Sequence, residues 1–205
     1  MNANARIFVV DNDGAVRESL SLLLEQEDFS VETFDSAEAF LTNFQAGPHS
    51  CAIVDIRMPV MDGMQLQAEL TRRGILLPVI FLTGHGDIPL SVRAIKHGAV
   101  DFLTKPVSGA TLLESVRMAL DESDRLNSVA AASQSAAERI VSLTEREREV
   151  MALAVDGLSN KESARRLGIS HRTVEIHRAR IMHKTGADTL IDLVRIAHAA
   201  APPPE

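Results

Sequence analysis

The sequence has little cysteine and no long hydrophobic run. Its single cysteine, Cys51, excludes an intramolecular disulfide. The longest apolar stretches, such as residues 75–82 and 51–54, have the length of a strand and fall far short of the ~20 residues that a membrane span needs. Residues 1–6 also lack the apolar region of a secretory signal. These absences exclude a membrane-spanning protein, and we expect a cytoplasmic protein that does not interact with membranes.

The net charge of -7 is distributed unevenly along the chain. Residues 1–137 hold 10 Lys and Arg against 18 Asp and Glu, which gives -8, whereas residues 138–205 hold 11 against 10, which gives +1. Within residues 159–184 there are seven basic and two acidic side chains. Such an asymmetry indicates that the second half meets a polyanion. A solvated charged helix face would have the same composition, so charge alone does not decide between them.

Residues 1–120 alternate between short β-branched runs and amphipathic helical patterns. The runs predict strands at residues 6–10, 30–34, 51–55, 79–83 and 101–104. Helices are expected near 14–27, 36–45, 62–73, 88–97 and 108–125. Ser36 and Ser108 are suitable N-caps, and Gly47, Gly74 and Gly98 lie where helices are expected to end. Five successive βα units predict an α/β domain with a five-stranded, doubly wound parallel sheet.

Beyond residue 121 the apolar periodicity fades into Ala, Ser, Gln and charge, which predicts a linker that can be part helical. The capping box Thr144-x-x-Glu147 then opens an all-α segment. Four short helices are expected there, near 145–156, 160–167, 171–185 and 188–199. The proline-rich end cannot continue a helix. The predicted organisation is a domain over 1–123, a linker over 124–140, a small four-helix domain over 141–200 and a disordered tail over 201–205.

Asp11, Asp55, Thr83 and Lys105 stand at or just after the ends of predicted strands. In a parallel sheet these ends share one edge, where the ligand crevice lies. Clustered carboxylates call for a hard cation such as Mg²⁺. A phosphoryl group arriving at Asp55, the nucleophile, would meet Mg²⁺ on one side and the Lys105 ammonium on another, while the Thr83 hydroxyl binds a phosphoryl oxygen. Each residue alone could be a turn residue, a strand terminator or an exposed cation, but their joint order favours the site.

Four motifs in this region resemble the response-regulator receiver family, whose fold is flavodoxin/CheY-like. They are Val-Asp-Asn-Asp at 10–13, Val-Asp-Ile-Arg-Met-Pro-Val-Met-Asp-Gly at 54–63, Thr-Gly-His-Gly-Asp at 83–87 and Asp-Phe-Leu-Thr-Lys-Pro at 101–106. The resemblance implies that Asp55 is the phosphoacceptor and that Thr83 and Phe102 form a switch pair. The metal ligands that it implies are Asp11, Asn12, Asp55 and the backbone carbonyl of Arg57. Asn12 departs from the family, which usually has a second acidic residue there.

The turn at residues 167–170 between two short predicted helices is a helix-turn-helix signature. On the second helix Val174 and Ile181 share one face, which we expect to be buried. The opposite face presents Arg172, Glu175, Ile176, Ala179 and His183. In a major groove, Glu175 could accept a hydrogen bond from cytosine, Ile176 could contact a thymine methyl and Ala179 would allow close approach. Basic side chains flank this face and would bind phosphates: Arg178, Arg180 and Lys184.

Residues 141–200 resemble the LuxR/FixJ-type DNA-binding domain, through the runs at 143–150, 157–164 and 173–178. The resemblance implies dimer contacts along the last helix. It also implies phosphate contacts from Lys161, Thr173, His177 and Lys184.

Together these features predict a phosphorylation-dependent transcription regulator and not an enzyme. Its expected partners are a sensor histidine kinase, promoter DNA in double-stranded form, RNA polymerase as a further partner, and a second copy of the chain once phosphorylated. A phosphatase or phosphotransferase with an appended binding module would need a second general acid or base near Asp55, and the sequence offers none that is free of the metal role. A third reading makes the receiver a phosphorylation-independent dimerisation module, and Asn12 alone supports it.

Overall fold

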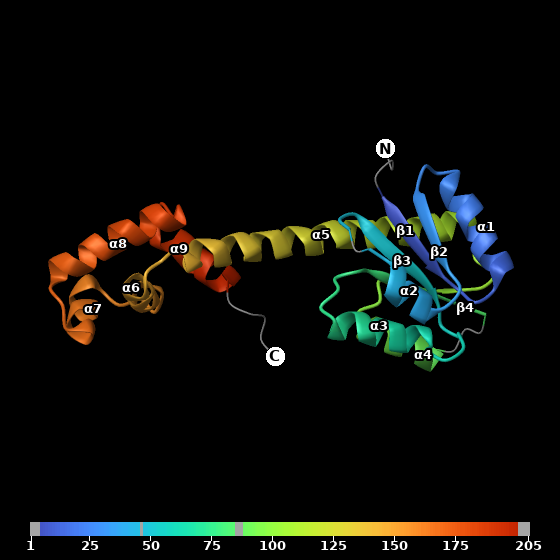
Figure 1. Cartoon of the computed structure of the whole chain (residues 1–205), viewed down its shortest axis with the longest axis horizontal. Coiled ribbons are helices and arrows are strands. Elements are labelled where there is room, and N and C mark those ends of the chain that lie inside the picture. Colours follow the sequence, from blue (N-terminus) through green and yellow to red (C-terminus); the bar gives the residue numbers. More distant parts are fainter. Residues whose placement is uncertain (1–4, 46, 85–87, 201–205) are drawn as a thin grey trace. The chain divides into compact units, whose positions relative to one another are not determined.

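The computed structural model describes residues 5–45, 47–84 and 88–200. The first part of the chain is built on a parallel sheet with the strand order β2-β1-β3-β4-β5 (Figure 1). The strands are β1 (Arg6–Val10), β2 (Ser30–Phe34), β3 (Ser50–Asp55), β4 (Val79–Thr83) and β5 (Asp101–Thr104). The helices between and after them are α1 (Gly14–Glu25), α2 (Ala37–Asn43), α3 (Gly63–Arg72), α4 (Ile88–Lys96) and α5 (Gly109–Val141). The predicted doubly wound α/β fold is confirmed.

Two hydrophobic clusters cover the two faces of the sheet. Leu24 of α1 and Leu112 of α5 pack against one face, whereas Phe40 of α2 and Leu66 of α3 pack against the other. All four side chains are fully buried. Strands covered on both faces are apolar throughout, as β4 is, with all five of its residues buried. The carboxyl ends of the strands are therefore where we expect polar groups on this sheet.

The second part of the chain is a cluster of short helices. They are α6 (Glu145–Val155), α7 (Asn160–Leu167), α8 (His171–Thr185) and α9 (Leu190–Ala200). Their core contains Leu143, Val150, Val174, Ile181 and Leu193, all at most 2% exposed. A capping box opens α6 at Thr144, as the sequence predicts, and a second one opens α7 at Ser159.

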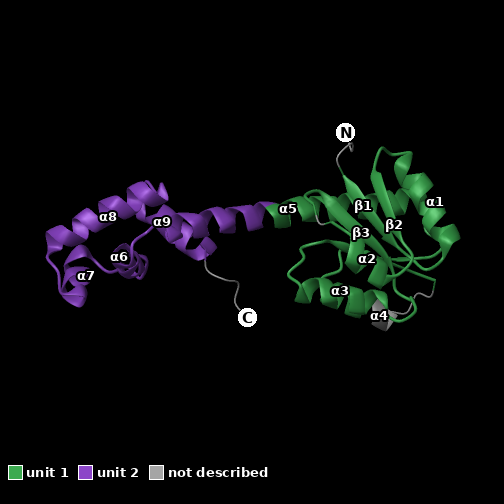
Figure 2. Cartoon of the chain, viewed as in Figure 1, with its two compact units in different colours: residues 1–127 green, residues 128–205 purple. Residues whose placement is uncertain are grey.

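The structure differs from the predictions in two places. Helix α5 does not end near residue 125 but continues to Val141, because residues 110–141 contain no Gly or Pro and many good helix formers. The segment expected as a linker is therefore helical, and the chain forms two compact units, residues 1–127 and 128–205 (Figure 2). Gly47 does not end a helix, because α2 already stops at Asn43 with Phe44 in an extended conformation. The predicted tail and residues 85–87 of the Thr-Gly-His-Gly-Asp motif lie outside the described residues.

Candidate functional site: a carboxylate crevice and a helix-turn-helix

Three charged side chains meet at the carboxyl ends of the strands. Asp11 follows β1, Asp55 ends β3 and Lys105 follows β5. The Lys105 Nζ lies 2.6 Å from Oδ2 of Asp11 and 2.9 Å from Oδ1 of Asp55. The two carboxylates are 2% and 6% exposed. The backbone N–H of Lys105 donates to the Thr83 carbonyl at 2.7 Å, and this bond ties the lysine to the end of β4. The predicted convergence of these residues at one sheet edge is what the structure shows.

The charges in this crevice do not balance. Two carboxylates against one ammonium leave a formal charge of -1. Burial raises the pKa of Asp55, and the neighbouring Asp11 charge adds to this, while the Lys105 ammonium acts in the opposite direction. Burial opposes the charged form of Lys105, but its hydrogen bonds to Asp11 and Asp55 outweigh that effect and raise its pKa. The lysine is thus held charged beside a carboxylate that a further cation would stabilise.

The oxygen donors fit a hard cation. Asp11 and Asp55 supply buried carboxylate oxygens, and the exposed Asn12 and the backbone of Arg57 adjoin them in the chain. Within the described residues, no group of three or more His, Cys, Asp or Glu side chains is placed to hold a metal. The predicted ligand set contains only two such side chains, so an amide and a carbonyl would have to complete it, and Mg²⁺ accepts both together with water.

Two further residues of the crevice were not predicted to take part in it. Arg17 of α1 donates from Nη1 to the backbone carbonyl of Asp11 at 2.6 Å. Asp13 caps α1 by accepting from the N–H of Ala15, and its own N–H donates to Oδ1 of Asp11 at 2.9 Å. A sequence signal existed for Arg17, because a cation near a helix N-terminus is unfavourable unless it has a partner of its own.

The start of α3 approaches β3 closely at Gly63. A Cβ added there would lie 2.5 Å from the Asp55 carbonyl oxygen. The N–H of Gly63 donates to the carbonyl of Ile56 at 3.0 Å. Only glycine can bring the start of α3 this near to the strand, so this residue helps to fix the crevice wall.

The predicted switch residues lie on neighbouring strands. Thr83 is fully buried at the end of β4, and Phe102 of β5 is half-buried against the cluster that contains Phe81. Phe81 and Phe102 are direct partners in the parallel ladder. The two side chains are therefore placed on the paired strands β4 and β5, and Lys105 of the crevice directly follows β5.

In the second unit, the turn between α7 and α8 has the predicted helix-turn-helix geometry. Gly168 adopts a left-handed conformation with φ 66°, and Ser170 caps α8 by accepting from the N–H of Thr173. Val174 and Ile181 are fully buried, as predicted. The opposite face of α8 is open to solvent at Arg172, Ile176, Ala179, Arg180, His183 and Lys184.

Ion pairs hold several of the predicted DNA-contacting side chains. Glu175 lies 3.2 Å from Nη1 of Arg172. Lys184 Nζ lies 2.7 Å from Oε2 of Glu147, which is 2% exposed and closes the capping box of α6. Nδ1 of His177 is buried without a hydrogen-bond partner, so only its other ring nitrogen can be turned toward a phosphate. Lys161 of α7 is exposed.

Comparisons with known proteins agree with this architecture. The sequence family of the response regulator receiver domain matches residues 7–117, and the luxR family of bacterial regulatory proteins matches residues 141–197. The chain is 41% identical over 200 residues to the transcriptional regulatory protein FixJ of Bradyrhizobium diazoefficiens, covering 98% of both chains. It is 42% identical to the response regulator protein TodT of Pseudomonas putida, covering 93% of this chain and 84% of TodT.

Solved structures give the same result. The response regulator StyR is 40% identical with a TM-score of 0.79, covering 95% of this chain and 98% of StyR. Full-length FixJ from B. japonicum is 41% identical with a TM-score of 0.58, covering 97% and 98%. No helix in the described residues is long and apolar enough to cross a membrane. A receiver sheet with its carboxylate crevice and a LuxR-type helix-turn-helix thus occur in one chain, which belongs to the FixJ-like response regulators of two-component systems, a family of transcription regulators.

Proposed function

We propose that a sensor histidine kinase activates this protein by phosphorylating Asp55, and that the phosphorylated chain forms a homodimer on promoter DNA in the cytoplasm. The observation that carries the proposal is the shared ion pair of Lys105 with Asp11 and Asp55. It holds a buried carboxylate beside a fixed cation, the arrangement that phosphoryl transfer requires.

In the proposed reaction, an Asp55 carboxylate oxygen attacks the phosphorus of the kinase phosphohistidine. The new O–P bond forms as the P–N bond breaks, and the imidazole leaves with the electron pair of that bond. Lys105 stabilises the charge on the phosphoryl oxygens. Mg²⁺, when bound by Asp11, Asn12, Asp55 and the Arg57 carbonyl, supplies further positive charge. The Thr83 hydroxyl then binds a phosphoryl oxygen, and Phe102 turns inward to alter the surface formed by α4, β5 and α5.

For DNA, the proposal assigns base contacts to Glu175, Ile176 and Ala179 of α8. The proposed phosphate contacts are Lys161, Thr173, His177, Arg178, Arg180 and Lys184, while Arg172 lies on the recognition face itself. Glu175 reaches a base only if it exchanges its ion pair with Arg172 for a cytosine amino group. Lys184 likewise has to leave Glu147 to contact a phosphate. Its contribution to DNA affinity is then offset by the cost of leaving the buried Glu147 carboxylate without its ion-pair partner. RNA polymerase is a further proposed partner.

The decisive experiment compares the wild type with Asp55→Asn in acetyl phosphate and Mg²⁺. We expect phosphate that is labile to both acid and base, as in an acyl phosphate, on the wild type only, because an amide does not attack phosphorus. Dimerisation and DNA binding should depend on phosphate and appear only where it is found. Far-ultraviolet circular dichroism controls for folding. Phosphate uptake by Asp55→Asn at the wild-type rate contradicts the assignment. Equal dimerisation and DNA affinity of both proteins would favour the alternative in which the receiver is a phosphorylation-independent dimerisation module.

A further inference from the structure

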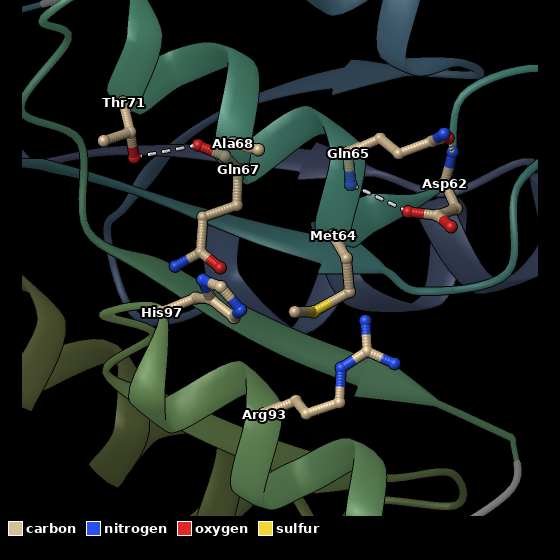
Figure 3. A pocket seen from close by; sticks show the side chains of 8 residues that line it. All are labelled: Asp62, Met64, Gln65, Gln67, Ala68, Thr71, Arg93 and His97. Atoms are coloured by element: carbon tan, nitrogen blue, oxygen red, sulfur yellow. Dashed lines mark hydrogen bonds between the residues drawn. The ribbon is translucent and has the colours of Figure 1, made fainter.

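A groove of about 570 Å³ lies between α3 and α4 (Figure 3), and Asp11, Asp55 and Lys105 are not among the residues that line it. Helix α3 lines it with Met64, Gln67 and Thr71, and the other wall is formed by Arg93 of α4 and by His97, which follows that helix. Small-molecule sites usually have volumes between about 300 and 1,000 Å³. The groove is therefore large enough for a small metabolite.

Gln67 gives this groove an acceptor without a donor. Its side chain is 6% exposed, and Oε1 is buried without a hydrogen-bond partner. The residue belongs to the buried face of α3 together with Leu66 and Leu70. An apolar side chain would pack there without the cost of burying an unpaired polar atom. Buried acceptors without a donor are rare in native proteins and call for an explanation. A donor from a bound ligand would satisfy this one.

The opposite wall carries the guanidinium of Arg93 and the imidazole of His97. His97 directly follows the last residue of α4, and its N–H donates to the carbonyl of Arg93 at 3.0 Å, so the two residues lie one helical turn apart on the same side. Across the described residues, neither side chain forms an ion pair with a carboxylate. Asp62, the acidic residue that lines the groove, lies at the other end from His97 (Figure 3), and its carboxylate accepts from the N–H of Gln65 at 2.8 Å. An oxyanion is the ligand group that suits the Arg93 and His97 side.

We propose that this groove binds a small oxyanion, a carboxylate or a phosphate ester, that also carries a hydroxyl group. The oxyanion contacts Arg93 and His97, the hydroxyl donates to Oε1 of Gln67, and the carbon skeleton contacts Met64. Binding at this groove requires neither phosphorylation of Asp55 nor DNA.

The test titrates the ¹⁵N-labelled full-length chain with two matched pairs of probes at constant ionic strength. Lactate and propionate are carboxylates with and without a hydroxyl, and glycerol 3-phosphate and propyl phosphate are the corresponding phosphates. We expect a hydroxylated probe to shift the backbone amides of α3 and α4 and the side-chain amide of Gln67, which is identified by its loss in Gln67→Leu. The pair that responds shows which oxyanion is bound.

Variants then locate the site. We expect Gln67→Leu and Arg93→Gln each to weaken binding by about tenfold or more, because each removes a hydrogen bond that is buried or charge-assisted. Lys96→Gln removes the same charge from the same helix outside the groove and should leave the affinity within about twofold. Thermal unfolding checks that each variant is folded.

Three results overturn the proposal. If no probe shifts α3 and α4, Gln67 is hydrated and the groove holds no ligand of this class. If Lys96→Gln weakens binding as much as Arg93→Gln, the attraction is general and not local to the groove. If the probes without a hydroxyl bind as tightly as their partners, Gln67 does not recognise a donor.

Discussion

Asn12 stands beside Asp11 at the end of β1, where receivers usually carry a second carboxylate. The formal charge of Asp11 and Asp55 together is -2, and an acid at position 12 would make it -3. A hard cation depends on that charge. Asp13 does not replace the missing carboxylate, because its side chain caps α1. The receiver thus has oxygen donors suited to Mg²⁺ but less charge to hold it.

We therefore expect Asn12→Asp to tighten Mg²⁺ binding and to speed phosphorylation by acetyl phosphate. Mg²⁺ is titrated at constant ionic strength. Binding is measured by calorimetry, because the chain has no Trp whose fluorescence could report it. Gln26→Glu is the control, since it adds the same charge at an exposed position at the end of α1. Equal affinities of Asn12→Asp and the wild type would remove position 12 from the metal site.

Among the elements, α6 and α8 are joined by the ion pair of Glu147 with Lys184. The hydrogen bond from Lys184 and that from the Thr144 backbone lower the pKa of Glu147 from 4.5 to about 2. A carboxylate whose pKa is lower in the folded than in the unfolded state stabilises the fold at pH values above the unfolded-state pKa. This stability is lost as the pH falls through the folded-state pKa. The helix-turn-helix unit should therefore lose stability between about pH 4.5 and 2.

The pH dependence of the melting temperature tests this ion pair. We expect Glu147→Gln to flatten the loss of melting temperature on acidification, because the amide does not titrate. Glu149→Gln is the matched control, since Glu149 is 46% exposed in an ion pair with Arg146 of the same helix. If the two variants follow the same pH profile, Glu147 does not stabilise the unit through its charge.

The exposed face of α8 predicts two kinds of DNA-binding defect. Arg180→Ala should weaken binding to all sequences alike and lower the salt slope by about one unit, because it removes one phosphate contact. Glu175→Ala should relax the preference at one base position, with a loss of discrimination of roughly 1–3 kcal/mol. Binding is measured over a salt series on the cognate site and its single-base variants. Proportional changes of salt slope and specificity in both variants would refute the assignment of the helix faces.

At the scale of the whole molecule, the two compact units have hydrophobic cores with no residue in common. Leu112 belongs to a core of the receiver, whereas Ile181 belongs to that of the helix-turn-helix. Domains with separate cores usually unfold as separate cooperative units. The thermal unfolding of the full chain should therefore show two transitions.

Calorimetry of two core variants assigns these transitions. Leu112→Ala should destabilise one transition by about 2–5 kcal/mol and leave the other in place, because it removes a fully buried side chain from one core only. Ile181→Ala should do the reverse. A single transition that both substitutions lower together would mean that the chain unfolds as one cooperative unit.

Local signals in the sequence were enough for the elements and for much of the site. All five strands were predicted to within one residue. The central strands β3 and β4 are nearly continuous apolar runs, whereas the edge strands β2 and β5 are short segments that mix polar with β-branched or aromatic residues. The start of α6 followed from the capping box of Thr144 and Glu147, whose hydrogen bonds join residues three apart. The convergence of Asp11, Asp55 and Lys105 followed from the parallel order of the strands alone.

The length of α5 is a local feature that the polar composition misjudged, whereas the side-chain contacts of the site depend on tertiary structure. The length of α5 was missed because polar composition predicts a linker, while the same residues have no helix breaker. The bond from Arg17 to the Asp11 carbonyl and the ion pair of Lys184 with Glu147 depend on how helices pack, which periodicity does not specify. The sequence by itself determined the strands, the caps and the order of the charged residues at strand ends, since these depend on local interactions. Which side chain meets which carboxylate was decided only when the chain folded back on itself.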